Sequence, residues 1–123
     1  MIEETKKKIT EKLIPSFEEA GNISLKLRQH GLKKEIKKDN TPVTNGDMEV
    51  NKLITDKIGN LTPNIEIVSE ESPANKSNEN LKTFWLIDPI DGTHDYINDR
   101  DEFTINAALI INNKPEIGII YAP

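Results

Sequence analysis

The segment WLIDPIDGTHDY, residues 85–96, places three carboxylates within eight residues directly after an apolar run. Pro89 presets the second position of a turn, so we expect the Asp88 and Asp91 side chains to converge on one side. Two such charges about 4 Å apart repel by about 4 kcal/mol at an effective dielectric near 20. A shared proton or a bound cation must therefore neutralise the pair.

A hard divalent cation such as Mg²⁺ suits this segment, because its preferred ligands are carboxylate, carbonyl and water oxygens. Ile90 offers a backbone carbonyl in the same turn, and Glu70 offers a third carboxylate at the end of another predicted strand. Gly92 and Thr93 begin a predicted short helix, whose free N–H groups would hold a phosphate beside the metal.

A water nucleophile would complete this set of groups. The Thr93 hydroxyl can orient a water molecule, and Asp47 is a candidate to accept the proton of that hydroxyl. Together these parts describe metal-assisted attack of water on a phosphate monoester.

Purely structural roles remain open for the same acids. Asp88 and Asp91 are also suited to capping a turn and the helix that follows it. Asp47 stands three residues after Thr44, which is an ordinary capping arrangement at the start of a helix. Glu70, at the end of a strand, would ordinarily face solvent.

Two helices are expected to position these groups. Along the first helix, apolar or small residues recur at three- and four-residue steps, at Ile9, Leu13, Phe17, Ala20, Ser24 and Leu27. Pro15 predicts a kink or a restart in this helix, and Gly31 predicts its end. A second helix opens at Thr44 and is expected to end at Gly59 and Asn60.

The connection between the helices, KKEIKKDN at residues 33–40, is basic and has the composition of a mobile loop. Its lysines, Lys37 among them, are placed to meet an anion. A solvated run of charge is the simpler interpretation of the same pattern.

Four strands are predicted, at residues 65–68, 84–87, 104–111 and 116–121. The polar residues 72–83 are expected to form a loop, and residues 112–115 join the last two strands into an antiparallel hairpin. Two helices followed by four strands indicate the α+β class. The first two strands run directly into acids, which brings Glu70 and Asp88 to strand ends.

The composition excludes several kinds of protein. The 123 residues suffice for one domain, and a net charge of −5 gives no general reason to expect a nucleic-acid partner. Residues 1–38 carry a net charge of +4 and the remainder −9, so the acidic segment lies in the acidic part. With no cysteine, no thiolate metal site or disulfide is possible. No apolar run reaches the length of a membrane span, and we expect a cytoplasmic location.

Residues 88–93, DPIDGT, preceded by Trp85-Leu-Ile and by Ser69-Glu-Glu71, resemble the inositol monophosphatase superfamily of Mg²⁺-dependent, lithium-sensitive phosphatases. Other segments look most like the 3'(2'),5'-bisphosphate nucleotidase branch, namely residues 40–44, 61–63, 68–71, 103–110 and 118–123. That branch removes a phosphate from adenosine 3',5'-bisphosphate, a by-product of sulfate assimilation. The resemblance implies the N-terminal part of a layered α/β/α/β/α fold, with two helices packed on a largely antiparallel sheet.

The resemblance also implies a metal-binding role for each matching acid. Glu70, Asp88 and the Ile90 carbonyl would hold the first Mg²⁺, and Asp88 with Asp91 would hold the second. A C-terminal aspartate of the family, in a Trp-Asp motif, completes the second metal site, and residues 1–123 contain no counterpart of it.

Catalytic and substrate-binding roles follow from the same resemblance. Asp47 would pair with Thr93 to activate water, with Glu70 as the third catalytic residue. Gly92 and Thr93 would contact the phosphate, and Lys37 would lie near it in the loop between the helices.

Two departures from the family pattern stand near these residues. Gly46 replaces the alanine common before the Asp47 position, and His94-Asp95-Tyr96 replaces a typical Lys-Glu-aromatic sequence. His94 therefore removes a positive charge near the substrate.

Residues 1–123 are thus expected to be an N-terminal, metal-binding α+β domain without the C-terminal α/β domain of the family. A sheet face that the second domain would cover is then exposed, to be covered by another copy in a homodimer or by a separately encoded C-terminal half. Besides a nucleotidase acting on a small phosphomonoester, two alternatives stay open. They are an inositol monophosphatase and a non-catalytic fragment that binds a cation or a partner chain.

Overall fold

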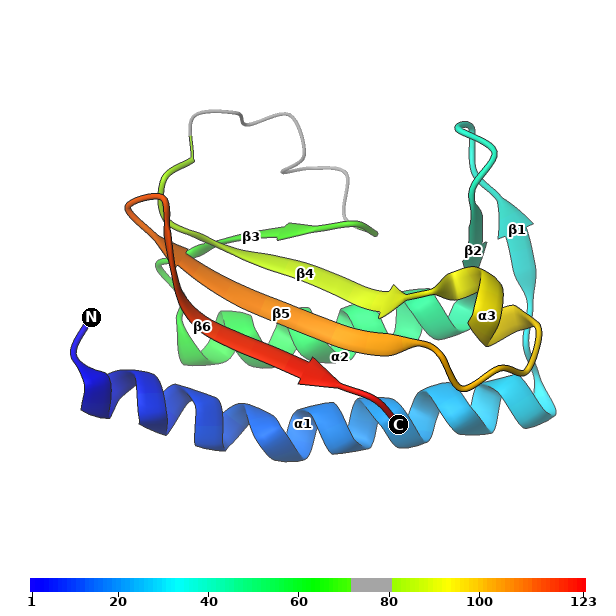
Figure 1. The fold of residues 1–123 in the computed structure, drawn as a ribbon, viewed down its shortest axis with the longest axis horizontal. Helices are drawn as coiled ribbons and strands as arrows, with labels where there is room; N and C mark the ends of the chain where they lie inside the picture. The colour runs from blue at the N-terminus through cyan, green and yellow to red at the C-terminus, as the bar shows by residue number, and fades with distance from the viewer. Residues whose placement is uncertain (72–80) are drawn as a thin grey trace.

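The computed structural model describes residues 1–71 and 81–123, so most of the predicted loop at 72–83 lies outside the described residues. The elements in chain order are α1 (Glu3–His30), β1 (Lys34–Ile36), β2 (Pro42–Thr44), α2 (Asn45–Leu61), β3 (Glu66–Ser69), β4 (Phe84–Asp91), α3 (Thr93–Ile97), β5 (Thr104–Ile111) and β6 (Lys114–Tyr121). The two long helices pack on a sheet, which confirms the predicted α+β class (Figure 1).

The main sheet has four strands in the order β3-β4-β5-β6. β3 runs parallel to β4, and the other two pairings are antiparallel, so the sheet is largely antiparallel as predicted. The loop between β5 and β6 contains Asn112 and Asn113, which have φ of 50° and 65°. Asparagine tolerates this left-handed conformation, which matches the twist of a two-residue hairpin loop.

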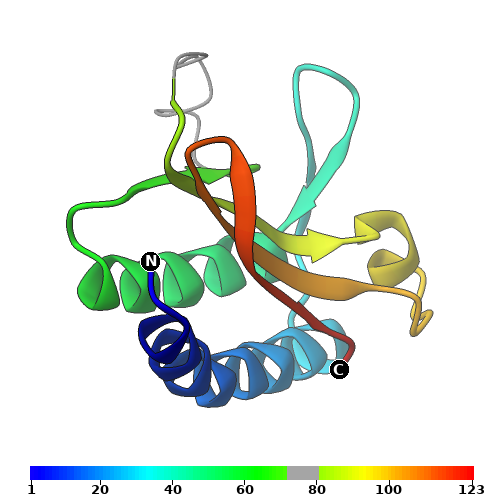
Figure 2. The ribbon, with the colours of Figure 1, turned by 60° about the vertical axis from the view of Figure 1, so that its left-hand side comes forward.

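α1 and α2 lie on the same face of the sheet, where the core forms (Figures 1 and 2). The side chains of this core are buried, and they come from both helices and from three strands: Leu13, Phe17, Ala20, Val50, Ile54, Ile58, Trp85, Ile87, Ile105, Ala107, Leu109 and Ile117. Their three- and four-residue spacing in the helices and two-residue spacing in the strands follow the periods of the two structures. The core therefore anchors the ends of α2 and β4, from which the acidic side chains project.

The structure differs from two expectations about the helices, namely the possible restart of α1 at Pro15 and the end of α2 at Gly59 and Asn60. α1 runs unbroken through Pro15 to His30, with no restart. Pro15 and Glu11, whose carbonyl loses its intrahelical donor, both lie on the exposed face, so water can satisfy that carbonyl. α2 continues past Gly59 and Asn60 to Leu61, because helix propensity is a weak signal compared with packing of the preceding turn on the core.

The basic segment between the helices is a hairpin and not a loop without structure. β1 and β2 pair in antiparallel fashion, with Lys34 opposite Thr44. Asn40, with φ of 68°, lies in the turn between them. In Figure 1 this hairpin stands at the same end of the molecule as α3. The sequence missed it because each strand has three residues, too few to show a period.

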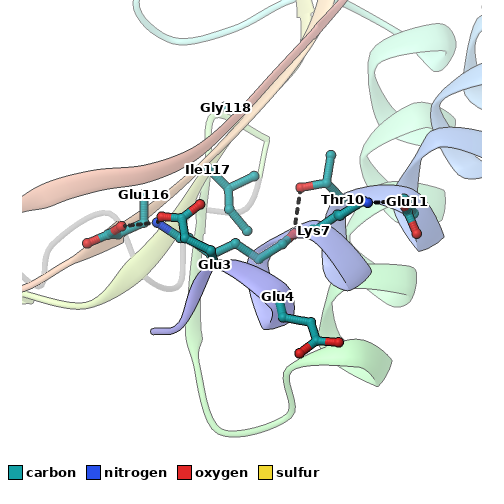
Figure 3. A pocket seen from close by; sticks show the side chains of 9 residues that line it. Glu3, Glu4, Lys7, Thr10, Glu11, Glu116, Ile117 and Gly118 are labelled. Carbon is teal, nitrogen blue, oxygen red and sulfur yellow. Dashed lines mark hydrogen bonds and ion pairs between the residues drawn. The ribbon is translucent and has the colours of Figure 1, made fainter.

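An ion pair connects the start of α1 to the edge strand β6. The Lys6 ammonium contacts Glu3 at 2.6 Å and donates to Glu116 at 2.9 Å, and these bonds raise the pKa of Lys6 and lower that of Glu116. The pair lines a shallow hollow of about 600 Å³ between the two elements (Figure 3). Its charges already satisfy one another, so this hollow has the character of a contact between elements.

The face of the sheet opposite α1 and α2 carries apolar side chains toward solvent. Leu86 on β4 is 46% exposed and Ile120 on β6 is 78% exposed. The strand register pairs Leu86 with Ala108, and Ala108 with Gly118. Ile120 follows Gly118 by two residues on the same strand, so all four residues lie on this face. We call Leu86, Ala108, Gly118 and Ile120 the outer sheet face. Among the described residues, no helix is both long and apolar enough to cross a membrane.

Candidate active site

The first turn of α2 holds Asp47 in a completely buried position. Thr44 and Asp47 form a capping box, in which the Asp47 amide donates to the Thr44 hydroxyl oxygen at 3.1 Å. In return, Asp47 Oδ2 accepts from the Thr44 amide at 2.9 Å and from its hydroxyl at 2.5 Å. The structural role that the sequence indicated for Asp47 is therefore present.

The capping box occupies only one oxygen of Asp47. Asp47 Oδ1 accepts a hydrogen bond from the Thr93 hydroxyl at 2.9 Å, across 46 residues of sequence. The Thr93 Oγ1 atom also lies 3.2 Å from the Ile90 carbonyl oxygen. A buried carboxylate thus has both a structural role through Oδ2 and a contact with the hydroxyl at the acidic segment through Oδ1.

Gly92 sets the position of Thr93. Its backbone φ is 90°, a conformation that residues other than glycine rarely adopt. A Cβ atom at this position would lie 2.7 Å from the Glu102 carbonyl oxygen. Directly after it, α3 begins at Thr93, as the sequence predicted. The glycine therefore allows the chain to turn from the sheet into the short helix that presents the hydroxyl.

Asp88 and Asp91 reach the same side by a different route from the predicted turn. Both belong to β4, where Asp88 is opposite Asn106 and Asp91 is opposite Thr104. Three residue steps on β4 thus match two on β5, which is a β-bulge with one extra residue. In a regular strand, side chains three residues apart point to opposite faces, and the extra residue returns Asp91 to the face of Asp88.

Glu70 adjoins this pair because β3 is parallel to β4. The Glu70 amide donates to the Ile87 carbonyl at 3.2 Å, so Glu70 follows the last paired residue of β3 beside Asp88. The acids border a cleft of about 340 Å³. The cleft is lined by Lys37, Asp39, Thr41, Pro42, Glu70, Glu71, Asp88, Ile90, Asp91, Gly92, Thr93 and His94.

The charges in this cleft act most strongly on Asp88. Burial, followed by the charges of Asp91, Glu70 and Asp47, raises the pKa of Asp88 from 3.8 to about 6. The Asp88 carboxyl group is therefore harder to ionise than an exposed one, and a positive charge that enters the cleft would stabilise its ionised form.

The donor chemistry of the cleft fits a hard cation, because its lining offers carboxylate, hydroxyl and carbonyl oxygens and no sulfur. The geometry is less complete. Within residues 1–71 and 81–123, no three His, Asp or Glu side chains are close enough together to hold one metal ion. Joint ligation by Glu70, Asp88 and Asp91 therefore stays a prediction, although the three side chains share one cleft.

Lys37 lies in the cleft at the start of the hairpin turn, where the sequence placed an anion-binding lysine. Its ammonium lies 3.7 Å from a carboxylate oxygen of Glu71, whose side chain is only 9% exposed. The lysine that the sequence placed in a loop therefore belongs to a hairpin, and it lines the cleft that contains the acids.

Several other residues of the cleft were not singled out as site residues from the sequence. Asp39 and Thr41 bond to each other at the hairpin turn, with the Thr41 hydroxyl donating to Asp39 at 2.5 Å. Glu71 also lines the cleft, where it forms an ion pair with Lys37. No local pattern marks Asp39 and Thr41, because the pairing of β1 with β2 brings the hairpin to the cleft.

Comparison with protein families assigns this chain. Residues 4–123 match the model of the inositol monophosphatase family. The chain is 43% identical over 91 residues to the 3'(2'),5'-bisphosphate nucleotidase CysQ of Haemophilus influenzae, covering 72% of this chain and 34% of that protein. It is 36% identical over 120 residues to CysQ of Buchnera aphidicola, covering 95% of this chain and 45% of that protein. The chain thus spans less than half the length of these curated relatives.

Solved structures show the same fold. An IMPase/NADP phosphatase complexed with Mg²⁺ and phosphate matches 96% of this chain and 45% of its own, with a TM-score of 0.83 and 22% identity. The Thermotoga maritima IMPase matches 89% of this chain and 42% of its own, with a TM-score of 0.77 and 28% identity. With the family model matching nearly every residue, the chain belongs to the inositol monophosphatase family.

Proposed function

We propose that residues 1–123 are the N-terminal, metal-binding part of a Mg²⁺-dependent phosphomonoesterase. Its substrate would be adenosine 3',5'-bisphosphate, hydrolysed to AMP and phosphate. The observation that carries this proposal is the hydrogen bond from the Thr93 hydroxyl to the buried Asp47, at the wall of the acidic cleft. The Thr93 hydroxyl is held by the Asp47 carboxylate next to a cluster of acidic side chains. Such an arrangement is suited to activating water for attack on phosphorus.

The direction of the Thr93 proton decides how this pair would act. Thr44 occupies Asp47 Oδ2, which leaves Oδ1 to accept the Thr93 proton. With its proton directed there, the Thr93 oxygen can accept a hydrogen bond from a water in the cleft. As that water attacks phosphorus, its proton passes to Thr93 Oγ1 while the Thr93 proton moves toward Asp47. The ester P–O bond breaks, and the leaving ester oxygen takes a proton from solvent water.

Four groups of the chain would hold the metal, namely the Glu70, Asp88 and Asp91 carboxylates and the Ile90 carbonyl. Bound there, Mg²⁺ would polarise the phosphate oxygens and acidify the attacking water. The raised pKa of Asp88 supports this role, because a carboxylate that is hard to ionise alone gains most from a cation. Gly92 and Thr93 would contact the phosphate through the start of α3, and Lys37 would approach it from the hairpin.

The nucleotide substrate is supported by the curated relatives. The Haemophilus influenzae relative, which is 43% identical to this chain over 91 residues, is named as a 3'(2'),5'-bisphosphate nucleotidase. Under this proposal the protein is cytoplasmic and hydrolyses a by-product of sulfate assimilation. The proposal also includes inhibition of the enzyme by lithium. An inositol monophosphate is the second candidate substrate, supported by the family model and by the fold of the solved neighbours.

The outer sheet face is a candidate contact for another polypeptide. We propose that a second polypeptide, either a C-terminal half or another copy of this chain, packs against the outer sheet face. Exposed Leu86 and Ile120 support an apolar contact there.

Phosphate release tests the proposed function. The chain, with Mg²⁺, is assayed on adenosine 3',5'-bisphosphate and on inositol 1-phosphate, alone and with a purified C-terminal half of a CysQ relative. We expect release from the nucleotide, increased by the added half and lost in Asp88→Asn. Preferred release from inositol 1-phosphate would identify the second candidate.

The non-catalytic alternative has its own signature in the same samples. Calorimetric titration that detects Mg²⁺ binding, without phosphate release from either substrate even after the C-terminal half is added, would establish a cation-binding fragment. Asp56→Asn is the matched control for Asp88→Asn, because Asp56 is exposed and does not line the cleft.

A further inference from the structure

One buried tyrosine joins three helices next to the Thr93–Asp47 pair. Tyr96 on α3 is fully buried, and its hydroxyl donates to the Ser24 backbone carbonyl of α1 at 2.6 Å. Burial and then the charge of Asp47 raise its pKa to about 12, so the hydroxyl keeps the proton that it donates. The helix α3 is therefore attached to α1 by a bond that persists throughout the ordinary range of pH.

The other contact of Tyr96 is with Gly46, the residue before Asp47. A Cβ added at Gly46 would lie 2.8 Å from two carbons of the tyrosine ring and closer still to its hydroxyl oxygen. Real Cβ atoms essentially never approach so closely, so the ring occupies the space that any other residue at position 46 would fill. The Tyr96 ring of α3 is thus in close contact with the first turn of α2.

The same two segments are joined at the catalytic pair. Tyr96 and Thr93 belong to one turn of α3, in which the Tyr96 amide donates to the Gly92 carbonyl at 2.9 Å. Gly46 and Asp47 are adjacent in α2. Since a short rigid turn carries both side chains, the spacing set by the ring on Gly46 also sets the spacing from Thr93 to Asp47.

Arg28 also packs against the ring. Its guanidinium carbon lies 5.7 Å from the centre of the Tyr96 ring and 5.2 Å from that of Phe103, and the two rings meet edge to face at 5.0 Å. The Arg28 side chain is 10% exposed and contacts Asp99 at 3.2 Å. These contacts with Arg28 and Phe103 limit the movement of the tyrosine away from Gly46.

We propose that Tyr96, seated on Gly46, is a positioning residue that holds the Thr93 hydroxyl at bonding distance from Asp47. The catalytic consequence rests on the proposed function, whereas the geometric consequence does not. A displacement of α3 by a fraction of an ångström lengthens the 2.9 Å bond and leaves the Thr93 proton without a fixed direction.

The test compares Gly46→Ala, Tyr96→Phe and the double variant. Gly46→Ala should push α3 outward, and a crystal structure should show Thr93 Oγ1 more than about 3.5 Å from Asp47 Oδ1, beyond hydrogen bonding. In the phosphatase assay kcat should fall about tenfold or more with KM changed less than about twofold, because the water is misdirected and the substrate contacts remain. The double variant should recover part of kcat, because a phenyl ring without the hydroxyl lacks the bond to Ser24 and can yield to the new methyl.

Gly59→Ala is the matched control, being the same substitution in the same helix. A Cβ there meets only the Ile67 Cδ1 atom, at 4.0 Å, so both the geometry and kcat should be unchanged. An unchanged Thr93–Asp47 distance in Gly46→Ala, or losses of kcat that only follow the fraction of folded protein, would overturn the proposal.

Two further outcomes are also decisive. If Gly46→Ala does not fold, Tyr96→Leu, which removes the ring, decides alone, since wild-type geometry and kcat in that variant would show that the ring does not position Thr93. If the wild-type chain releases no phosphate under any condition, the proposed function fails, and the measured distance still decides the positioning role.

Discussion

Asp88 lies in an environment that differs clearly from that of an ordinary surface carboxylate. It lies among four other acids, Glu70, Glu71, Asp91 and Asp47, which together with burial favour its protonated form. An acid in this state binds protons or cations readily. The pH dependence of stability therefore reports on the cleft without any assay of activity.

We predict that, in metal-free buffer, ionisation of Asp88 destabilises the fold as pH rises from about 4 to about 6. The folded-state pKa of about 6 exceeds the value of 3.8 in the unfolded chain, so the folded state binds more protons across this interval. The loss should amount to about 1–2 kcal/mol after allowance for solvent screening. Urea unfolding at a series of pH values, with Asp88→Asn as reference, measures it.

The reference variant should lack this fall in stability, and Mg²⁺ at pH 7 should stabilise the wild type more than Asp88→Asn. Parallel stability curves for the two proteins would show that the Asp88 charge is not destabilising. The bulge in β4 explains why this residue shares a face with Asp91, a relation that regular strand geometry forbids.

At the scale of secondary-structure elements, α2 combines a structural cap with the candidate catalytic acid. Thr44 caps the helix and, through its amide and hydroxyl, occupies one oxygen of Asp47. The cap therefore decides which oxygen remains for Thr93. A change at Thr44 should affect both helix stability and the orientation of the acid.

We predict that Thr44→Ala lowers the free energy of unfolding by about 1–2 kcal/mol, because a buried cap and one hydrogen bond to a carboxylate are lost. Thr44→Ser, which keeps the hydroxyl, should retain most of that stability. Chemical denaturation measures both. Equal destabilisation by the two substitutions would assign the effect to the lost methyl group and not to the hydroxyl.

At the scale of the whole molecule, the two faces of the main sheet differ. One face is covered by α1 and α2, whereas the outer sheet face presents Leu86 and Ile120 to solvent. Apolar surface of this kind favours association with another polypeptide. The charge of the chain, −5, opposes self-association only weakly at physiological salt.

We predict that the isolated chain self-associates through this face and that Leu86→Lys with Ile120→Lys makes it monomeric. Two added charges oppose burial of the face, and neither side chain contributes to the covered core. Sedimentation velocity over a range of concentrations measures the change. Met48→Lys is the control, since Met48 is 48% exposed on α2, and equal effects of the control and the double variant would exclude a specific role for the outer sheet face.

Local patterns in the sequence determined the elements and the family. The helical stripe of α1, the capping box of α2 and the alternation of β5 were legible because each depends on neighbours within a few residues. The same holds for the acidic segment and its glycine, whose spacing carries both the chemistry and the family resemblance. Element ends, at Leu61 for example, and the short hairpin between β1 and β2 were less legible, since packing outweighs weak local preferences there.

Only the tertiary structure decided how these parts meet. The contact of Tyr96 with Gly46 appears in no local pattern. The family resemblance implied that Thr93 pairs with Asp47, and the structure gives the hydrogen bond between them, 2.9 Å long across 46 residues. The bulge that aligns Asp88 with Asp91 exists only through pairing with β5. No window of sequence contains these relations, because they result from close packing between segments that are distant along the chain.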